Sequence, residues 1–388
     1  MIARNIILFL LLVVLPEVYI YWHYFRRHHV VWWKRALWWL PCVFMLGYII
    51  WLYQVDGFVP SDISILYLFL FLFGLLVVPK VAFALFSATG LLWCRWRKKR
   101  RNWGSLFGLL FSLFVVYVVV YGSTIGFRKL EVNHVDFYFA ELPDSFDGYK
   151  IVLFSDAHVG SYHGDRQKIL ARTIDSINAQ GADAICFVGD LQNTVPQDIY
   201  EHRGLLSSLH APDGVFSIMG NHDYADYVKV SDAEAVANVR ETMSLERQFG
   251  WNLLLNEHAV LRRGSDSIVI AGIENDGVKK GIRRSDVKQS LAGVDDGAFI
   301  IMLAHDPSIW REKVLPESTA QLTFSGHTHG GQVRLFGFSP ASMMYSELEG
   351  KHEAEGYGRS IFVTRGIGGL IPFRFGCPGE IVVITLHK

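Results

Sequence analysis

Polar side chains that bind divalent metals in proteins follow five short apolar runs in the second part of the chain. Carboxylate, amide and imidazole groups are the oxygen and nitrogen ligands that manganese, iron and zinc accept. A single Asp after a strand usually caps a turn, and a single His is usually a satisfied polar residue. Five such endings in one stretch of sequence instead favour a metal centre. In chain order the residues are Asp156, His158, Asp190, Asn221, His222, His305, His327 and His329.

The runs that precede these side chains have the length and composition of β-strands. Strands are expected at 150–155, 184–188, 215–219, 267–272, 299–304 and 322–325, and helices at 166–179, 197–209 and 232–249. Strands that alternate with helices predict an α/β layered domain. Open α/β sheets bind ligands at the carboxyl ends of their strands, so we expect the five polar loops to lie together.

The order of these motifs is itself informative. Asp-x-His, Gly-Asp, Gly-Asn-His-Asp, His and Gly-His-x-His together resemble the signature of the calcineurin-like metallophosphoesterases. The resemblance covers residues 148–388, and the stretches 364–368 and 378–381 are similar to the membrane-attached bacterial branch of that family. It implies a four-layer α/β fold, with two β-sheets between helices, and hydrolysis of a phosphomonoester or phosphodiester.

The resemblance also implies two divalent metal ions, which can be manganese, iron or zinc. The implied ligands are Asp156, His158 and His329 for one ion, Asn221, His305 and His327 for the other, and Asp190 for both. Two ions about 3.5–4 Å apart can grip both the attacking and the leaving oxygen of an in-line displacement. A hydroxide held between them would be the nucleophile, so the reaction needs no Ser or Cys nucleophile.

His222 matches the catalytic histidine of the family, which stabilises developing charge or protonates the leaving oxygen. Some phosphoprotein phosphatases of the family have an Asp three residues after the Gly-Asp aspartate, where it orients this histidine. Here that position is Asn193. An amide does not stabilise an imidazolium as a carboxylate does, so both roles of His222 stay open.

Three arginines and an apolar loop near the end of the chain are candidates for substrate contact. Arg334, Arg365 and Arg374 are candidate phosphate contacts, and the alternative for each is an ordinary surface side chain. The stretch 367–375 has apolar residues between glycines. It either borders the site and admits an acyl or prenyl chain, or packs as a loop at the sheet edge.

Four apolar runs occupy the first third of the chain, at 6–22, 36–53, 63–93 and 105–121. Each is near or above the 18–20 residues that span a bilayer as a helix. The third is long and contains Pro79, so we expect one kinked or tilted span. Glu17, in the first run, either marks an ion path or, more ordinarily, is an interfacial or helix-paired side chain.

Basic residues gather in two of the three loops between these runs. Arg26, Arg27, Lys34 and Arg35 follow the first run, and six Lys or Arg lie within 95–101. The positive-inside rule places both loops in the cytoplasm. We therefore expect a multi-pass protein of the cytoplasmic (inner) membrane, with its catalytic domain on the extracytoplasmic side.

Charge is divided unevenly along the 388 residues. Residues 1–129 have 14 Lys or Arg and three acidic side chains, whereas 130–388 have 23 basic and 34 acidic side chains. The acidic balance of the second part argues against nucleic acid as a partner. The composition indicates a transmembrane helical region at 1–122, a linker at 123–147 and a catalytic domain at 148–388.

Two classes of function fit these features. One is a membrane-anchored phosphoesterase that acts on a lipid-linked or cell-envelope substrate. The other is a membrane sensor or transport component whose metal domain binds without catalysis. The complete ligand set, with His222 beside it, favours the enzyme.

Overall fold

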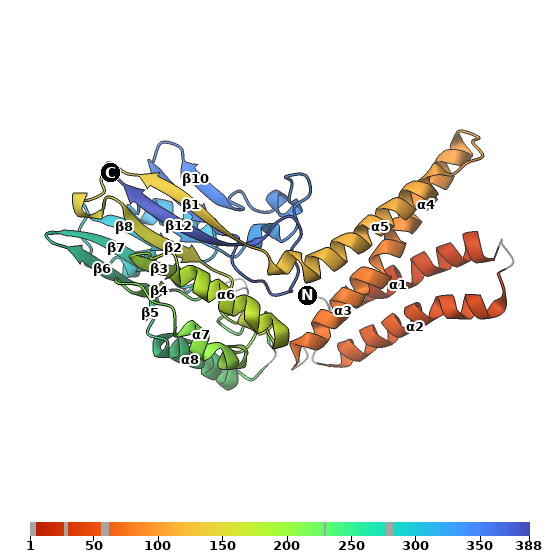
Figure 1. Cartoon of the computed structure of the whole chain (residues 1–388), viewed down its shortest axis with the longest axis horizontal. Helices are drawn as coiled ribbons and strands as arrows, with labels where there is room; N and C mark the ends of the chain where they lie inside the picture. Colours follow the sequence, from red (N-terminus) through yellow and green to blue (C-terminus); the bar gives the residue numbers. More distant parts are fainter. Residues whose placement is uncertain (1–4, 27–29, 56–61, 229, 277–281) are drawn as a thin grey trace. The chain divides into compact units, whose positions relative to one another are not determined.

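The computed structural model describes residues 5–26, 30–55, 62–228, 230–276 and 282–388. Arg27 of the first basic loop lies outside these ranges. The chain forms two compact units, Met1–Ile125 and Gly126–Lys388 (Figure 1). The first is helical, and the second contains all the strands of the described residues.

The helices of the first unit are long and apolar. They are α1 (Ile6–Ile20), α2 (Trp32–Gln54), α3 (Ile63–Leu76), α4 (Val78–Trp96) and α5 (Trp103–Thr124), and a π-helical turn, η2 (Tyr21–Phe25), extends α1. By length and composition four stretches can cross a membrane: Ile6–Phe25, Trp32–Gln54, Ile63–Trp96 and Trp103–Arg128. The four predicted spans are therefore confirmed as helices.

The third span has the predicted kink. α3 ends at Leu76 and α4 begins at Val78, with Pro79 in the first turn of α4. Proline is tolerated there because the first N–H groups of a helix have no acceptor within the helix. The chain therefore bends at Val77 and continues as a second helix.

An ion pair joins two helices inside the first unit. The Lys80 ammonium pairs with the Glu17 carboxylate, and it lies 4.6 Å from the centre of the Trp38 ring. Glu17 is almost fully buried. A charge in an apolar bundle is stable only when it is paired, so Glu17 is a helix-paired side chain, the more ordinary of its two interpretations.

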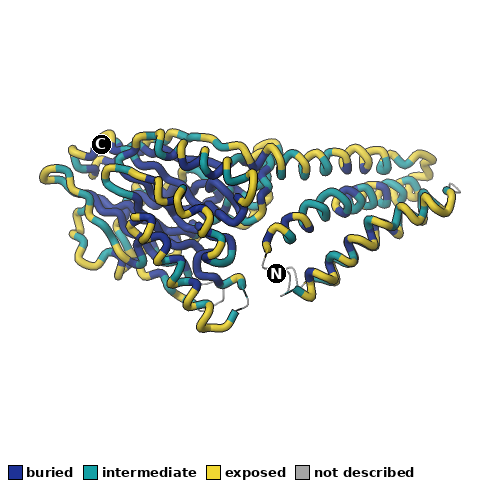
Figure 2. The backbone as a smooth tube through the Cα atoms, turned by 60° about the horizontal axis from the view of Figure 1, so that its bottom comes forward, coloured by how far each residue is buried: buried dark blue, intermediate teal, exposed yellow. Residues whose placement is uncertain are grey.

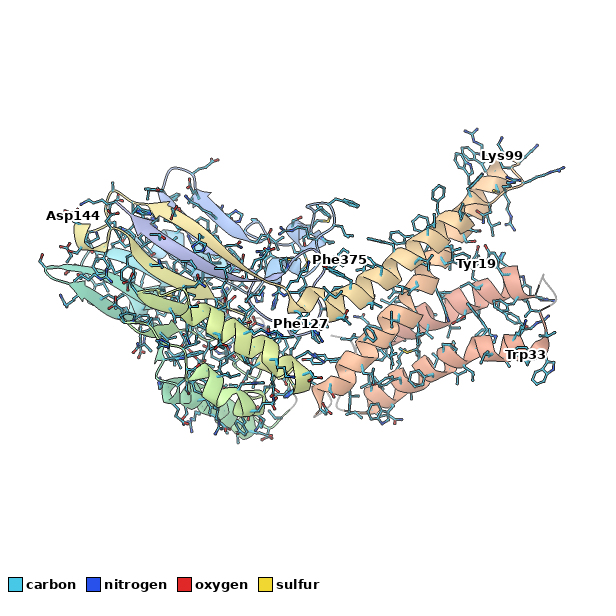
Figure 3. All side chains as sticks on the ribbon, viewed as in Figure 1. Tyr19, Trp33, Lys99, Phe127, Asp144 and Phe375 are labelled. Atoms are coloured by element: carbon cyan, nitrogen blue, oxygen red, sulfur yellow. The ribbon has the colours of Figure 1, made fainter. Side chains whose placement is uncertain are left out.

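α4 and α5 form an antiparallel hairpin around the basic turn that contains Lys99 (Figure 3). The two backbones approach closely at Gly104, where an added Cβ would lie 2.2 Å from the Phe86 carbonyl oxygen. Small residues allow such packing between apolar helices, where the hydrophobic effect contributes little.

The second unit contains two six-stranded sheets. The first has the order β1 (Leu130–Tyr138), β12 (Gly379–His387), β2 (Tyr149–Phe154), β3 (Ala184–Phe187), β4 (Val215–Ser217) and β5 (Asn252–Leu253). The second has the order β10 (Gly350–Ala354), β11 (Arg359–Val363), β9 (Leu322–Ser325), β8 (Phe299–Leu303), β7 (Asp266–Gly272) and β6 (Glu257–Arg263). The neighbours from β2 to β5, and those from β11 to β7, are parallel.

Successive side chains of a strand point to opposite faces of its sheet, and this alternation creates the layers. In β2, Ile151 and Leu153 join the core between the two sheets, whereas Val152 and Phe154 join the core beneath the helices. The helices on the first sheet are α6 (Gln167–Asn178), α7 (Arg203–Leu206) and α8 (Asp232–Gln248); on the second they are α9 (Val287–Ser290) and α10 (Leu315–Glu317), preceded by the π-helical turn η8 (Trp310–Val314). The central strands of both sheets are largely buried, whereas the edge strands β1, β6 and β10 are mostly not (Figure 2). The four-layer α/β fold is thus confirmed.

Two segments differ from the expectation. The stretch 123–147, expected as a linker, contributes β1, which pairs in parallel with β12. The expected helix at 197–209 is instead a 3-10 helix, η7 (Pro196–His202), followed by the single turn of α7. The six strands and the other two helices expected from the sequence all form.

Candidate metal centre

The loops that follow five of the strands bring the candidate ligands together. Three groups have ligand atoms that lie within 4.8 Å of one another. They are Asp156 with His158 and His329, Asp190 with His305 and His327, and His158 with Asp190 and His222. The first two groups match the two ligand sets that the family resemblance implies, apart from Asn221.

Asp190 belongs to the second group and also lies close to His158 of the first. Its Oδ2 is 3.5 Å from His158 Nε2 and 3.2 Å from His305 Nε2, and its Oδ1 accepts the backbone N–H of His222 at 2.8 Å. The amide oxygen of Asn221 is 3.1 Å from His305 Nε2. Asp190 can therefore share its carboxylate between two sets of ligands.

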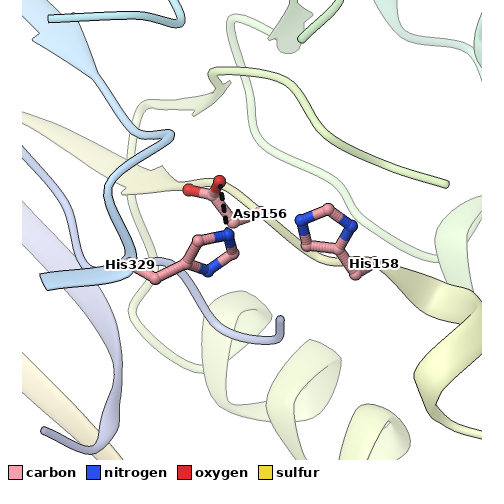
Figure 4. A group of neighbouring side chains, drawn as sticks. All are labelled: Asp156, His158 and His329. Atoms are coloured by element: carbon pink, nitrogen blue, oxygen red, sulfur yellow. Dashed lines mark ion pairs between the residues drawn. The ribbon is translucent and has the colours of Figure 1, made fainter. Parts of the chain in front are cut away.

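The first group is shown in Figure 4, where the imidazoles of His158 and His329 flank Asp156. His329 Nε2 is 3.5 Å from Asp156 Oδ1, and the centres of the two rings are 5.1 Å apart. The backbone N–H of His327 donates to the same carboxylate at 3.1 Å. The loop after β9 thus reaches across to the loop after β2.

Three imidazoles are oriented by main-chain carbonyls. A carbonyl only accepts, so each Nδ1 carries the hydrogen and each Nε2 is left for the site. Metal-binding histidines typically donate their other N–H in this way. The pairs are His158 with Gln192 (3.2 Å), His305 with Val188 (2.7 Å) and His222 with Asn193 (2.6 Å). His158 Nε2 is buried and has no hydrogen-bond partner in the described part of the chain, as expected of a nitrogen that serves a metal ion.

The backbone of the ligands is strained. Five of them have a positive φ: Asp156 (50°), His158 (43°), Asp190 (61°), His327 (69°) and His329 (52°). Such conformations cost roughly 1–3 kcal/mol for a residue other than glycine and concentrate at functional sites. Here they turn consecutive ligands towards one point immediately after each strand.

Glycines allow the loops to approach the carboxylates. A Cβ at Gly220 would lie 2.2 Å from Asp190 Oδ1, and a Cβ at Gly326 would lie 2.6 Å from Asp156 Oδ2. Both distances are far below van der Waals contact. The Gly-Asn-His-Asp and Gly-His-x-His motifs therefore need their glycines for space.

Burial determines the charge of most imidazoles in the cluster. It lowers the pKa of His158 to about 3, with the nearby His222 contributing, and it also lowers the pKa of His327 and of His329. These rings are therefore neutral, which is the form that binds metals. Burial also lowers the pKa of His305, but the Asp190 carboxylate outweighs it and raises that pKa to about 10. His305 must release a proton when it becomes a ligand.

The two carboxylates differ in the same environment. Burial raises the pKa of Asp156 to about 7. Burial also acts to raise the pKa of Asp190, but His305 and His222 outweigh it and hold that pKa well below its ordinary value. Asp190 is thus the permanent negative charge of the cluster.

Two tyrosines beside the site were not apparent from the sequence. The Tyr227 ring stacks on the His222 ring with 4.2 Å between their centres, and its hydroxyl accepts the Asn221 amide N–H at 2.7 Å. The Tyr345 hydroxyl is 3.2 Å from His327 Nε2. Neither tyrosine belongs to a motif, so only their positions in the fold reveal them.

Asn193 holds His222 through its backbone and not through its side chain. Its carbonyl accepts from His222 Nδ1, whereas its amide nitrogen donates to Ser161 Oγ at 3.0 Å. An Asp at this position would therefore not orient His222 as its counterpart in phosphoprotein phosphatases does. Asp223, the last residue of the Gly-Asn-His-Asp motif, accepts four backbone N–H groups and is structural.

The structure argues against phosphate contact by the three candidate arginines. The Arg374 side chain is fully buried, and its guanidinium donates to five main-chain carbonyls between residues 365 and 378. Arg365 pairs with Glu380 and Glu131, and Arg334 pairs with Glu349. Since burial and these partners occupy the guanidinium groups, we correct the substrate-binding assignment of Arg365 and Arg374: they organise the loop.

That loop packs against the ligand cluster. The backbone N–H groups of Ile367 and Gly368 donate to the carbonyls of Ser155 and Asp156, at 3.0 and 2.9 Å. Ile367 is buried, and Ile371 is the only exposed apolar residue within 367–375. These contacts favour the packed loop over the acyl-binding one.

Models of two protein families match the chain. The transmembrane domain described as "Probable Calcineurin-like phosphoesterase" matches residues 3–127, and "Calcineurin-like phosphoesterase" matches residues 149–331. The donor set and its geometry fit divalent metal ions. The match to the transmembrane family agrees with the four apolar spans.

Three relatives illustrate the range of similar proteins. The metallophosphoesterase YkuE of Bacillus subtilis, described as uncharacterized, is 34% identical over 64% of this chain and 82% of its own. A transmembrane protein with metallophosphoesterase domain from Danio rerio is 30% identical over 74% and 64% of the two chains. The UDP-2,3-diacylglucosamine pyrophosphatase LpxG of Chlamydia trachomatis is 27% identical over 63% of this chain and 86% of its own. With the ligand cluster and the fold, these matches establish that the chain belongs to the calcineurin-like metallophosphoesterase family, as a membrane-associated hydrolase of phosphoester bonds.

Proposed function

We propose that this protein hydrolyses a phosphomonoester or phosphodiester that carries an apolar chain, a lipid-linked or cell-envelope molecule. The observation that carries this substrate class is an exposed apolar segment, 335–344, that leads directly into the ligand cluster. The proposal refines the family's hydrolytic activity by naming what the substrate must look like.

Four large apolar side chains of segment 335–344 are exposed to solvent. Phe336 is fully exposed, Met343 and Met344 are 84% and 80% exposed, and Phe338 is about half exposed. Phe336 stands in a turn that Leu335 and Phe338 close, and its φ is 51°. A patch of this kind on a soluble surface usually marks a binding site or a contact with lipid.

The same segment reaches the site through the residue that follows it. Tyr345 comes immediately after Met344, and its hydroxyl is within hydrogen-bond distance of His327 Nε2. An acyl chain resting on Met343 and Met344 would therefore hold its phosphate end near the candidate ligands. The name of the relative LpxG specifies a diacylated substrate, which supports the same class.

We assign the chemistry to the residues already described. The ligands would be Asp156, His158 and His329 in one set, Asn221, His305 and His327 in the other, and Asp190 in both. When bound, two ions such as manganese, iron or zinc supply positive charge to the phosphoryl oxygens and lower the pKa of water. The Asp190 carboxylate would connect both sets, and the packing around the loops holds the ligands in their strained backbone conformations.

His222 acts on the leaving oxygen in this proposal. Its Nδ1–H is fixed on the Asn193 carbonyl, so Nε2 faces the cluster and is the atom that can hold a proton. The stacked Tyr227 ring limits rotation of the imidazole. Protonated at Nε2, His222 can donate to the leaving oxygen, as a general acid does.

The catalytic unit would act at the extracytoplasmic face of the cytoplasmic membrane. The basic run at 95–101 supports this orientation, because Lys and Arg are retained on the cytoplasmic side of a membrane. With four spans, the segment after α5 would then emerge on the opposite side. Envelope lipids and their precursors are present at that surface.

The test uses the full-length protein in detergent, loaded with manganese, iron or zinc. We expect hydrolysis of an aryl phosphate monoester or diester by the wild type and none by Asp190→Asn. We also expect a preference for phosphatidic acid in mixed micelles over glycerol 3-phosphate, which lacks the acyl chains. Absence of turnover with every metal and ester would instead favour a binding module.

A matched pair of variants tests the apolar segment itself. Phe336→Ser combined with Met344→Ser should raise KM for the acylated ester and leave the water-soluble aryl ester unaffected. Tyr138→Ser, which removes an aromatic side chain that is 69% exposed on β1, is the control. Equal effects of the double variant on both esters would refute an acyl-binding role for the segment.

A further inference from the structure

A second group of metal-ligating side chains lies outside the ligand cluster. It consists of His163, Glu201 and His202, whose ligand atoms lie within 4.8 Å of one another. His163 comes just before the 3-10 helix η6 (Gly164–Arg166), and the other two residues end η7. None of the three belongs to the phosphoesterase motifs.

The carboxylate of Glu201 lies between the two imidazoles. Its Oε1 pairs with His163 Nδ1 and is 3.4 Å from His202 Nε2. Its other oxygen, Oε2, accepts the Gln167 amide N–H at 2.9 Å. Gln167 therefore fixes the carboxylate so that Oε1 faces both rings, as residues behind a metal ligand commonly do.

The burial of the His202 imidazole is not explained by the hydrogen bonds around it. The side chain is buried and has only weak acceptors nearby, Glu201 Oε1, at 3.4 Å from Nε2, and the Val159 backbone. Neither ring nitrogen forms a hydrogen bond of good geometry among the described residues. A buried polar group without a partner is costly and points to a bound species that completes it. Burial lowers the pKa of His202 despite the nearby Glu201, so its ring is neutral and fit for a metal.

We propose that His163, Glu201 and His202 bind one zinc ion, with water as the fourth ligand. Two imidazoles and a carboxylate are a common zinc ligand set that leaves one position open. Zinc–nitrogen bonds of about 2.0–2.1 Å place tetrahedral ligands about 3.3 Å apart. The 3.4 Å between Glu201 Oε1 and His202 Nε2 already matches this spacing. His163 and Glu201 lie closer together than that, and both side chains are partly exposed, so they have room to rotate apart around an ion.

The ion would join two segments that position the phosphoesterase ligands. His163 follows the loop of His158 and the 3-10 helix η5 (Val159–Ser161). The Asp198 carboxylate of η7 accepts the backbone N–H groups of Asn193 and Thr194, next to the carbonyl that holds His222. Zinc at this position would therefore connect the supports of His158 and His222 while remaining outside the reaction.

The test counts zinc in the full-length protein in detergent. Chelator-treated protein is titrated with zinc ions alone, dialysed and measured by elemental analysis. We expect His163→Ala and Glu201→Gln each to bind one zinc ion fewer than the wild type. His210→Ala, which removes an exposed histidine eight residues beyond His202, is the control and should bind as many as the wild type.

Two further variants separate this site from the ligand cluster. Asp190→Asn should lose zinc from the cluster but keep the ion that His163→Ala loses. Gln167→Ala removes only the group behind the carboxylate and should weaken zinc binding about 10–100-fold while the count at saturation is retained. Equal zinc counts in the wild type and His163→Ala would overturn the proposal, whatever the fate of phosphoesterase activity.

Discussion

Replacing Gly220 with alanine tests whether Asp190 must occupy its present position. The added Cβ would lie 2.2 Å from Asp190 Oδ1, 2.5 Å from the Asp190 nitrogen and 2.8 Å from its Cγ. Ordinary contacts begin near 3.4 Å, so the carboxylate must move by about 1 Å. Gly220 does not have a positive φ, so the effect is one of space and not of backbone strain.

The expected loss follows from that displacement. A misplacement of about 1 Å in a catalytic constellation costs roughly 100-fold in rate. This corresponds to about 2.7 kcal/mol of transition-state stabilisation. Because Asp190 lies between both ligand sets, we also expect metal content to fall together with kcat/KM for an aryl phosphate ester.

The matched control is Gly204→Ala in α7, where an added Cβ meets no atom of the described residues within 4 Å. This variant should retain wild-type activity and metal content. Thermal unfolding of both variants shows whether each is folded at the assay temperature. A folded Gly220→Ala protein with wild-type metal content and kcat/KM within about twofold would refute the role given to Asp190.

Three other predictions concern orientation, proton transfer and stability. Reporter tags within 95–101 should read as cytoplasmic and tags after Lys388 as extracytoplasmic; a cytoplasmic C-terminus would overturn the proposed side of the catalytic unit. If His222 protonates the leaving oxygen, His222→Ala should slow esters with poor leaving groups far more than activated aryl esters, whereas equal slowing would assign it to charge stabilisation. Burial, followed by the nearby Asp223, raises the pKa of Glu246 well above its ordinary value, so its contribution to stability is present at low pH and lost as pH rises. Glu246→Gln should therefore gain stability over the wild type with increasing pH, by up to about 1.36 kcal/mol per pH unit in thermal unfolding; a constant difference would contradict the shift.

The parts of the site that the sequence predicted are those encoded locally. Asp156, Asp190 and His305 each follow a short apolar strand within three residues, so strand prediction also located the ligands. Parallel pairing then brings the ends of neighbouring strands to the same edge of a sheet. The motif order and the fold class follow from these short segments alone.

The parts that it did not predict depend on distant or main-chain contacts. Only one of the nine residues of β1 is buried, so its sequence has the polar character of a linker. The carbonyl of Asn193 holds His222, and no side-chain pattern encodes a carbonyl contact. Arg374 has the positive charge expected of a residue that binds phosphate. In the fold, however, the main-chain carbonyls of the surrounding loop accept hydrogen bonds from its guanidinium nitrogens.

The place of β12 in its sheet has a consequence for biosynthesis. This last strand lies between β1 and β2, and the Asn133 side chain on β1 bonds to Glu380, 247 residues later. Glu380 also holds Arg365 in the loop that packs on Asp156. Until the ribosome has made β12, β1 and β2 both present open edges, and the support behind Asp156 does not exist. We therefore expect the nascent protein to lack phosphoesterase activity until translation has passed β12.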